Sequence, residues 1–288
     1  MSLAMPSATL LGQSLLSGIF IGGLYALLGL GLSLSWGYLR LINLAHFALA
    51  FLGAYLVFQL AGVAGFTVVA AVLVVVPAFF VLGVAMQVMF ARFEVAEFAS
   101  LLVTFGIAII VESAIQWFWT ADLRKFQFEF GTVSIQVGSL FVPVVEAIMF
   151  LVAAALSVGT WVFLRFTLVG KALRASAENP DIAAAFGVDH RRLALMLSGF
   201  ATALAAVAGA FIAMAYTLSP AQMFSWMGVV FAVVILGGLG NPLGVLAAGL
   251  VIGVSESLTM ALTAPTWAPL VSFTLLIAVL VLRPDRIG

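Results

Sequence analysis

The chain has 288 residues, of which 65% are hydrophobic and 8% are charged, and its mean hydropathy is +1.30. A soluble domain needs far more charge on its surface, so the composition excludes a soluble protein. Basic and acidic residues balance to zero net charge. The absence of cysteine excludes disulfides, thiol nucleophiles and cysteine-based metal sites.

A hydrocarbon core about 30 Å thick needs about 20 mostly apolar residues for each helical span. Apolar runs of this kind fill nearly the whole chain. The fold class is therefore predicted to be all-α, a polytopic transmembrane helix bundle of eight or nine spans and a single domain over 1–288. The expected spans are 9–36, 41–62, 67–90, 98–119, 143–164, 193–216, 223–238, 245–262 and 267–282. No basic segment or cleavage site precedes the first run, so we expect it to be a retained span.

Two regions are expected to hold broken or re-entrant helices. Asn43 and His46 interrupt the run at 41–62. The sequence Gly-Gly-Leu-Gly-Asn-Pro at 237–242 interrupts the apolar stretch at 223–245. Such breaks are tolerated only where protein or a water-filled cavity satisfies the freed backbone groups.

The basic residues predict the orientation of the chain. In the nine-span arrangement nine of them fall on one side of the membrane, and Arg124 and Lys125 fall on the other. The nine are Arg40, Arg92, Arg165, Lys171, Arg174, Arg191, Arg192, Arg283 and Arg286. Because basic loops stay in the cytoplasm, we expect the loop at about 166–192 and the C-terminus to be cytoplasmic. The N-terminus is then outside.

The cytoplasmic loop contains a short helix whose two ends are both specified. Asn179 is a good N-cap, Pro180 suits the first helical position, and Asp181 complements the positive end of the helix dipole. Gly187 can take the left-handed conformation that ends a helix. A helix of barely two turns is unstable alone in water.

One face of this short helix is apolar, because Ile182 and Phe186 are four residues apart. One interpretation is a capped connector that packs on its own bundle. The other is a coupling helix that docks into a partner. Permease subunits of ATP-binding-cassette importers carry a Glu-Ala-Ala or similar run followed by a glycine, and Ala-Glu-Asn-Pro-Asp-Ile-Ala-Ala-Ala-Phe-Gly at 177–187 resembles that loop.

Further motifs extend a resemblance over most of the chain. They are Gly23-Leu-Tyr-Ala-Leu-Leu-Gly-Leu-Gly-Leu-Ser-Leu-Ser-Trp-Gly37, Leu41-Ile-Asn-Leu-Ala-His46, Leu52-Gly-Ala-Tyr55, Lys171-Ala-Leu-Arg174 through Asn179-Pro180, and Val234-Ile-Leu-Gly-Gly-Leu-Gly-Asn-Pro-Leu-Gly244. In order and spacing they resemble the branched-chain amino acid ABC importer permeases, a family that includes urea and short-chain amide permeases. Phe47 stands where that family commonly has glycine, and Asn241-Pro242 replaces a more usual serine-containing turn.

The resemblance implies a non-catalytic, multi-pass permease subunit in the bacterial inner membrane. It would carry branched-chain or other hydrophobic amino acids, with urea, short-chain amides or small organic acids as alternatives. The implied partners are a second permease subunit (a paralogue or a second copy), two ABC ATPase subunits that hold ATP and Mg, and a periplasmic solute-binding protein. No cofactor, metal or nucleic acid is expected on this chain. The residues that would couple to the ATPase are Glu178, Asn179, Pro180, Asp181, Ile182, Ala183, Ala184, Ala185, Phe186 and Gly187.

Few polar residues interrupt the spans, and each needs a partner or a cavity, since a charge at the centre of a span costs roughly 2.5–3.5 kcal/mol. Asn43, His46 and Phe47, at i, i+3 and i+4, are expected on one helical face. They are interpreted either as contacts between helices or as lining of the solute path. One histidine alone makes no metal site.

Three further polar residues lie within spans. Glu112 and Gln116 share a face of the fourth span, and Glu256 lies between two serines in the eighth. Structural hydrogen bonding is the favoured interpretation, because an ATP-driven importer needs no proton relay. Gly249 and Gly253 permit close helix packing, with packing inside the subunit favoured over a subunit interface.

Exposed backbone groups at glycine-rich breaks can bind a small zwitterion. On this ground the remaining candidates for the solute path are Thr104, Gly106, Gly237, Gly238 and Gly240.

Two other classes of function remain as alternatives. An ATP-independent secondary transporter with inverted repeats would use the breaks near 31–46 and 237–244 as its sites. A polytopic membrane enzyme has little support, because the chain has no HExxH motif, nucleophile elbow or clustered carboxylates. The chain also has no phosphate-binding loop, so ATP hydrolysis is expected on separate subunits.

Overall fold

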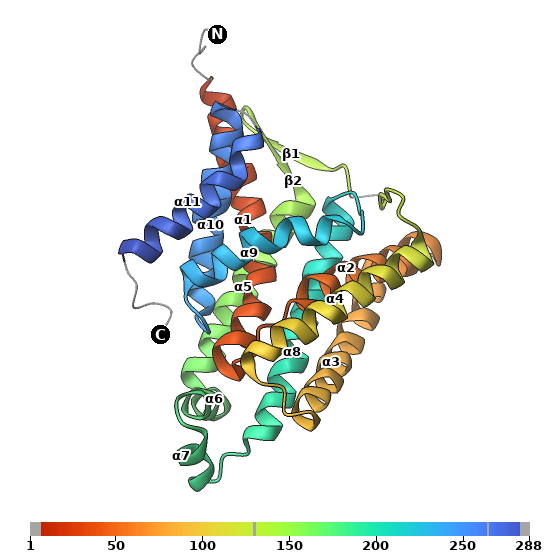
Figure 1. Ribbon diagram of the computed structural model, residues 1–288. Helices are drawn as coiled ribbons and strands as arrows, with labels where there is room; N and C mark the ends of the chain where they lie inside the picture. Colours follow the sequence, from red (N-terminus) through yellow and green to blue (C-terminus); the bar gives the residue numbers. More distant parts are fainter. Residues whose placement is uncertain (1–6, 129–130, 264, 283–288) are drawn as a thin grey trace.

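The computed structural model describes residues 7–128, 131–263 and 265–282. Over these residues the chain forms a bundle of α-helices with one small hairpin (Figure 1). The helices are α1 (Ala8–Leu39), α2 (Ala45–Val57), α3 (Val68–Arg92), α4 (Glu97–Trp119), α5 (Val144–Phe166), α6 (Leu168–Glu178), α7 (Pro180–Ala185), α8 (His190–Ala215), α9 (Gln222–Gly237), α10 (Pro242–Leu262) and α11 (Ala268–Leu282). Helix α2 continues as a π-helical segment, Phe58–Val63, and a 3-10 turn, Pro265–Trp267, precedes α11.

Each predicted apolar run coincides with a helix. Among the described residues, seven helices are long and apolar enough to cross a membrane: α1, α2 with its π-helical continuation, α3, α4, α5, α8 and α10. This confirms an all-α, multi-pass membrane bundle. Helices α9 and α11 are shorter, and the 16 residues of α9 extend only about 24 Å against a hydrocarbon core of about 30 Å. The choice between eight and nine spans stays a prediction.

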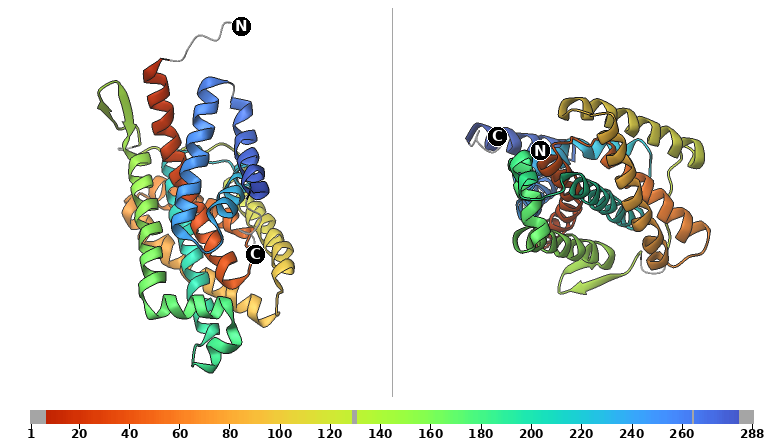
Figure 2. Two further views of the ribbon diagram at one scale, coloured as in Figure 1. Left: turned by 90° about the vertical axis from the view of Figure 1, so that its left-hand side faces the viewer. Right: turned by 90° about the horizontal axis from the view of Figure 1, so that it is seen from below.

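The long helices alternate in direction, so the connecting segments gather at two ends of the bundle (Figure 1, Figure 2). At the end that carries α6 and α7, the Arg40 guanidinium donates to the carbonyl oxygen of Ala177, 3.5 Å away, and Arg92 and Arg191 line one hollow. At the other end, Arg124 forms a backbone bridge with the segment that follows α8.

The basic residues therefore separate between the two ends as the sequence predicts. Seven of the nine assigned to the cytoplasm belong to segments at the α7 end. The other two, Arg283 and Arg286, lie outside the described residues, as do both chain termini. The orientation of the termini stays a prediction.

Helices α1, α2 and α8 form the centre of the bundle, and most of their side chains are buried. Helices α1 and α10 approach closely through glycines. A Cβ atom on Gly249 would lie 2.6 Å from the carbonyl oxygen of Gly22, and one on Gly253 would lie 2.5 Å from that of Gly18. The predicted role of the Gly249 and Gly253 pair in packing within the subunit is confirmed.

The segment between α4 and α5 contains an antiparallel hairpin that was not predicted. Strand β1 (Ser134–Val137) pairs with β2 (Leu140–Pro143). The Gln13 side chain in α1 donates to the carbonyl oxygen of Phe141, 2.8 Å, and accepts from its N–H, 3.0 Å. This ties the hairpin to the start of α1, at the end of the bundle opposite to α7 (Figure 1).

The break between α1 and α2 corrects two expectations. Helix α2 begins only at Ala45, so Asn43 precedes the helix and does not share a helical face with His46 and Phe47. His46 therefore lies inside a regular helix and does not interrupt one. The non-helical segment instead covers residues 40–44. Hydroxyl groups of α4 accept hydrogen bonds from its backbone N–H groups, as described below.

Candidate functional site

Helix α7 forms the tip of the bundle at one end (Figure 1). As predicted, Asn179 caps the helix: its side-chain oxygen accepts a hydrogen bond from the backbone N–H of Ile182, 3.0 Å. Pro180 occupies the first helical position, where its missing N–H leaves no bond unmade. The start of the helix is therefore fixed by its own sequence.

The end of α7 is fixed by Gly187, as predicted. This residue has φ +84, the left-handed conformation, and its N–H donates to the carbonyl oxygen of Ala184, 2.9 Å. The N–H of Val188 donates to the carbonyl oxygen of Ala183, 3.1 Å. This pair of bonds is the Schellman motif, which stops a helix at a left-handed glycine.

The large apolar side chains of α7 and its C-cap point outward. Ile182 is 57% exposed and Phe186 is 85% exposed, whereas the small Ala183 is buried. A connector that packs on its own bundle would bury the two large side chains. The structure instead leaves them available to another protein, which favours the coupling-helix interpretation.

Helix α6 connects α7 to the rest of the bundle. Thr167 caps α6 by accepting from the N–H of Gly170, 3.0 Å. The Ser176 hydroxyl lies 2.6 Å from Nδ1 of His190 at the start of α8, and Arg40 reaches the end of α6 from α1. Because α6 also follows α5 directly, α6 is connected to three long helices, α1, α5 and α8.

Two hydroxyls of α4 hold the break between α1 and α2. The backbone N–H of Ile42 donates to Ser100 Oγ, 3.1 Å, and that of Leu44 donates to Thr104 Oγ1, 3.0 Å. The Thr104 hydroxyl oxygen also lies 3.0 Å from the carbonyl oxygen of Ile42. Thr104, a candidate for the solute path, is fully buried and has a structural role here.

The substitution Thr104→Val tests this role, because it leaves the buried N–H of Leu44 without an acceptor. A buried, unsatisfied donor costs about 1–3 kcal/mol, so we expect a lower melting temperature in detergent, by about 2–4 °C for each kcal/mol. The matched control is Thr259→Val, since among the described residues the Thr259 hydroxyl bonds only the Ser255 carbonyl of its own helix. Equal melting temperatures for the two variants would contradict the structural role of Thr104 at the break between α1 and α2.

His46, Phe47 and Asn43 are all buried. The His46 ring packs against α1 at Gly31, where a Cβ atom would lie 3.0 Å from Nε2. The ring centroid of Phe47 lies 6.0 Å from that of Phe231 in α9. These contacts place the residues between helices, and a role in the solute path stays a prediction.

The second break is confirmed where the sequence places it. Helix α9 ends at Gly237, and Gly238 and Gly240 have φ values of +90 and +69. Ser33 Oγ accepts from the N–H of Gly240, 2.9 Å, and lies 3.3 Å from the carbonyl oxygen of Gly238. The Tyr38 hydroxyl donates to the carbonyl oxygen of Gly240, 3.1 Å. Helix α1 thus binds the backbone groups that were expected to be open to a zwitterion, and contact with solute stays a prediction.

Glu112 and Gln116 lie together on the outer side of α4. The Gln116 side-chain amide donates to the Glu112 carboxylate, 3.1 Å, so the predicted shared face is confirmed. A Cβ atom on Gly106, earlier in the same helix, would have no described atom within 4 Å. The space beside Gly106 is therefore open.

Glu256, in contrast, is buried and hydrogen bonded. Its carboxylate accepts from the Tyr25 hydroxyl, 2.9 Å, and from the Ser272 hydroxyl. The partners come from α1 and α11 and not from the neighbouring serines of α10. These bonds join three helices and support the structural interpretation of this carboxylate.

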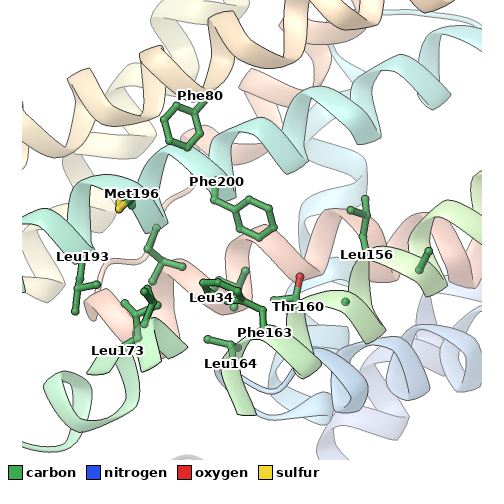
Figure 3. Close-up of a pocket in the computed structure, with 14 residues that line it drawn as sticks. Leu34, Phe80, Leu156, Thr160, Phe163, Leu164, Leu173, Leu193, Met196 and Phe200 are labelled. Atoms are coloured by element: carbon green, nitrogen blue, oxygen red, sulfur yellow. The ribbon is translucent and has the colours of Figure 1, made fainter. Parts of the chain in front are cut away.

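An apolar cavity of about 510 Å³ lies between α1, α3, α5, α6 and α8 (Figure 3). Of the 14 residues that line it, Thr160 alone has a polar side chain. The ammonium and carboxylate groups of an amino acid each need a polar partner when they leave water. This cavity therefore does not suit an amino acid as ligand.

Three residues that hold the two breaks were not predicted: Ser33, Tyr38 and Ser100. Ser33 and Ser100 lie in the predicted spans 9–36 and 98–119, and Tyr38 lies between the first two predicted spans. Hydroxyl groups in or near apolar runs were the available signal, since Ser and Thr side chains are among the groups that satisfy freed backbone groups inside a membrane.

These features define a class: a multi-pass helical membrane protein with a capped, outward-facing helix at one end of its bundle. The chain belongs to the family described as branched-chain amino acid transport system / permease component, whose sequence model matches residues 14–280. The predicted family is confirmed.

Individual relatives agree over almost the whole chain. It is 25% identical over 295 residues to the high-affinity branched-chain amino acid transport system permease protein LivH of Escherichia coli K12, covering 96% of this chain and 94% of the relative. It is 24% identical to BraD of Pseudomonas aeruginosa, with the same coverage, and 28% identical to a probable LivH of Methanocaldococcus jannaschii, covering 95% and 92%. No solved structure gives a significant match.

Proposed function

We propose that this chain is the non-catalytic, membrane-spanning subunit of an ATP-driven importer. Its solutes are branched-chain or other hydrophobic amino acids. The transport named for the family and for the relatives supports this choice of solute. Urea, short-chain amides and small organic acids are the alternatives.

The observation that carries the proposal is the exposed apolar face of α7. Ile182 and Phe186 project from a helix whose ends are both fixed, at the tip of the bundle. A rigid, protruding apolar surface of this kind can dock into a groove on a separate ATPase subunit. When ATP draws two ATPases together, each would carry its bound α7, and α6 would pass the movement to the long helices.

The distribution of basic residues supports the orientation of the chain in the membrane that this proposal requires. Seven basic residues gather at the α7 end. By the positive-inside rule this supports a cytoplasmic position for that end in a bacterial inner membrane. The hairpin of β1 and β2 then faces the periplasm, where a solute-binding protein would deliver its cargo. A second permease subunit completes the path.

A pull-down tests the proposal. We would tag the chain, extract it from its native membrane in mild detergent, identify the bound proteins by mass spectrometry and assay ATPase activity. We expect an ATPase with a phosphate-binding loop and a second permease of related sequence. A pure, ATPase-free protein that still transports solute would contradict the proposal and favour a secondary transporter.

A further inference from the structure

A hollow of about 640 Å³ lies between the ends of α1, α3 and α8 that are nearest to α7, and we call it the α3–α8 hollow. Helices α3 and α8 lie side by side (Figure 1) and touch at Gly83, where a Cβ atom would be 2.5 Å from the Ser198 carbonyl oxygen. The hollow begins one helical turn nearer to the α7 end, at Gln87 in α3. The glycine contact therefore bounds the hollow on the side of the membrane interior.

Positive charge is in excess at the outer end of the α3–α8 hollow. Arg92 at the end of α3 and Arg191 at the start of α8 both line it, and Glu94 is its one carboxylate. With histidine counted as neutral, these three side chains leave one excess positive charge. Neither guanidinium group forms an ion pair among the described residues. Because arginine binds phosphate through two parallel hydrogen bonds, the charges favour a ligand with a singly anionic phosphate group.

Gln87 supplies a second, independent indication of a ligand. Its side chain lines the hollow and is only 9% exposed, and its Oε1 atom has no hydrogen-bond partner among the described residues. No bond to this oxygen holds the amide in one orientation, so the amide can turn and present its NH2 donors to a ligand. Gln87 lies five residues before Arg92, about 7.5 Å deeper along α3. The ligand therefore needs an acceptor below its phosphate, where a phospholipid carries its ester carbonyls.

The deeper wall of the hollow is suited to an acyl chain. Eight of the 13 lining residues are apolar. Val88 in α3 and Leu195 in α8 each lie one helical turn inside the arginine of the same helix. Val88 is 42% exposed on the outward side of α3, so a chain that follows it leads out of the hollow along that helix. A free phosphate needs no such wall, whereas charge at the helix ends and apolar residues below them match the polarity of a phospholipid.

We infer that the α3–α8 hollow binds an anionic phospholipid, with the phosphate at Arg92 and Arg191 and one acyl chain along Val88. Basic pockets between membrane helices are known binding sites for phospholipid head groups. Glu94 disfavours a second negative charge and can accept from a head-group hydroxyl, so we expect a head group such as phosphatidylglycerol. His190 both lines the hollow and contacts α6, which places the lipid beside the connection between α8 and the loop that carries α7. This inference goes beyond the transport function and does not rest on it.

Lipid binding is measured on the full-length chain, purified in detergent and freed of native lipid. Native mass spectrometry records bound lipid during titration with phosphatidylglycerol, with phosphatidylethanolamine and with a mixture of the two. Glycerol phosphate is the competitor that carries the phosphate without acyl chains. We expect phosphatidylglycerol to bind in preference and glycerol phosphate not to displace it. Equal binding of the two lipids, or displacement by glycerol phosphate, would overturn the inference, the second by showing a site for free phosphate esters.

Paired variants locate the site. Arg92→Gln together with Arg191→Gln is expected to weaken phosphatidylglycerol binding about tenfold or more, because both charge-assisted contacts to the phosphate are lost. The matched control is Arg165→Gln together with Lys171→Gln. It removes the same charge at the same end of the bundle from exposed residues that do not line the hollow. Equal weakening in the two pairs would show a diffuse effect of charge and would overturn the inference.

Gln87→Met gives a test that leaves both arginines in place. The variant removes a buried oxygen that has no partner among the described residues, so we expect the lipid-free chain to melt at the same temperature as the parent or higher. Phosphatidylglycerol is then expected to raise the melting temperature less than it does in the parent. An undiminished rise would overturn the placement of the lipid in the hollow, even if the paired arginine variant fails to fold.

Discussion

Phe186→Ala is expected to remove most ATP-driven uptake while the protein stays folded in the membrane. The phenyl ring is 85% exposed, so its loss leaves no cavity in the bundle. In the proposed complex the same ring fills a groove on the ATPase, and truncation of such a central aromatic anchor costs about 2 kcal/mol or more of binding, roughly a thirtyfold weaker contact. Initial rates of leucine uptake and the amount of co-purified ATPase measure the two effects.

The matched control is Phe93→Ala. Phe93 is also a highly exposed phenylalanine at the α7 end of the bundle, but it follows α3 and lies outside the coupling loop. We expect this variant to keep normal uptake and normal ATPase recovery. Equal loss in the two variants, or no loss with Phe186→Ala, would refute the docking role of α7.

Gly253→Ala is expected to destabilise the folded bundle, because it overpacks the contact between α1 and α10. Its new Cβ atom would lie 2.5 Å from the Gly18 carbonyl oxygen and 2.6 Å from Gly22 Cα. Both neighbours are backbone atoms of α1, so neither can rotate away. Overpacking of this kind typically costs 1–3 kcal/mol, and we expect the melting temperature in detergent to fall by about 2–4 °C for each kcal/mol.

Gly159→Ala in α5 provides the control for this change. A Cβ atom at Gly159 meets no described atom within 4 Å. Alanine also favours a helix over glycine by about 1 kcal/mol, so the melting temperature should stay the same or rise. If both variants lose stability equally, the close approach of α1 and α10 is not the cause of the loss in Gly253→Ala.

Local features of the chain were predictable because their causes are local. The N-cap at Asn179, the left-handed Gly187 and the break at Gly238 and Gly240 each follow from the conformational preference of the residue itself. The apolar runs predicted the helices for the same reason, since nearly every residue of a span must tolerate lipid or a packed interior.

The pairings across the bundle were not predictable in this way. Tyr25 and Glu256 are 231 residues apart, and their bond depends on the register of α1 against α10. The hydrogen bond of Thr104 to the break before α2 likewise depends on how α4 crosses that segment. These contacts explain why Asn43 was wrongly placed on a helix: hydroxyls on another helix replaced the bonds that a helix would have given its backbone.

ATP-driven uptake by the purified complex in proteoliposomes tests the central claim most directly. The complex recovered through this chain would be reconstituted with its solute-binding protein and supplied with radiolabelled leucine, with ATP on the ATPase side. We predict uptake that requires hydrolysable ATP and is indifferent to imposed proton or sodium gradients. Uptake by the chain alone, driven by a gradient in the absence of ATP, would contradict the account.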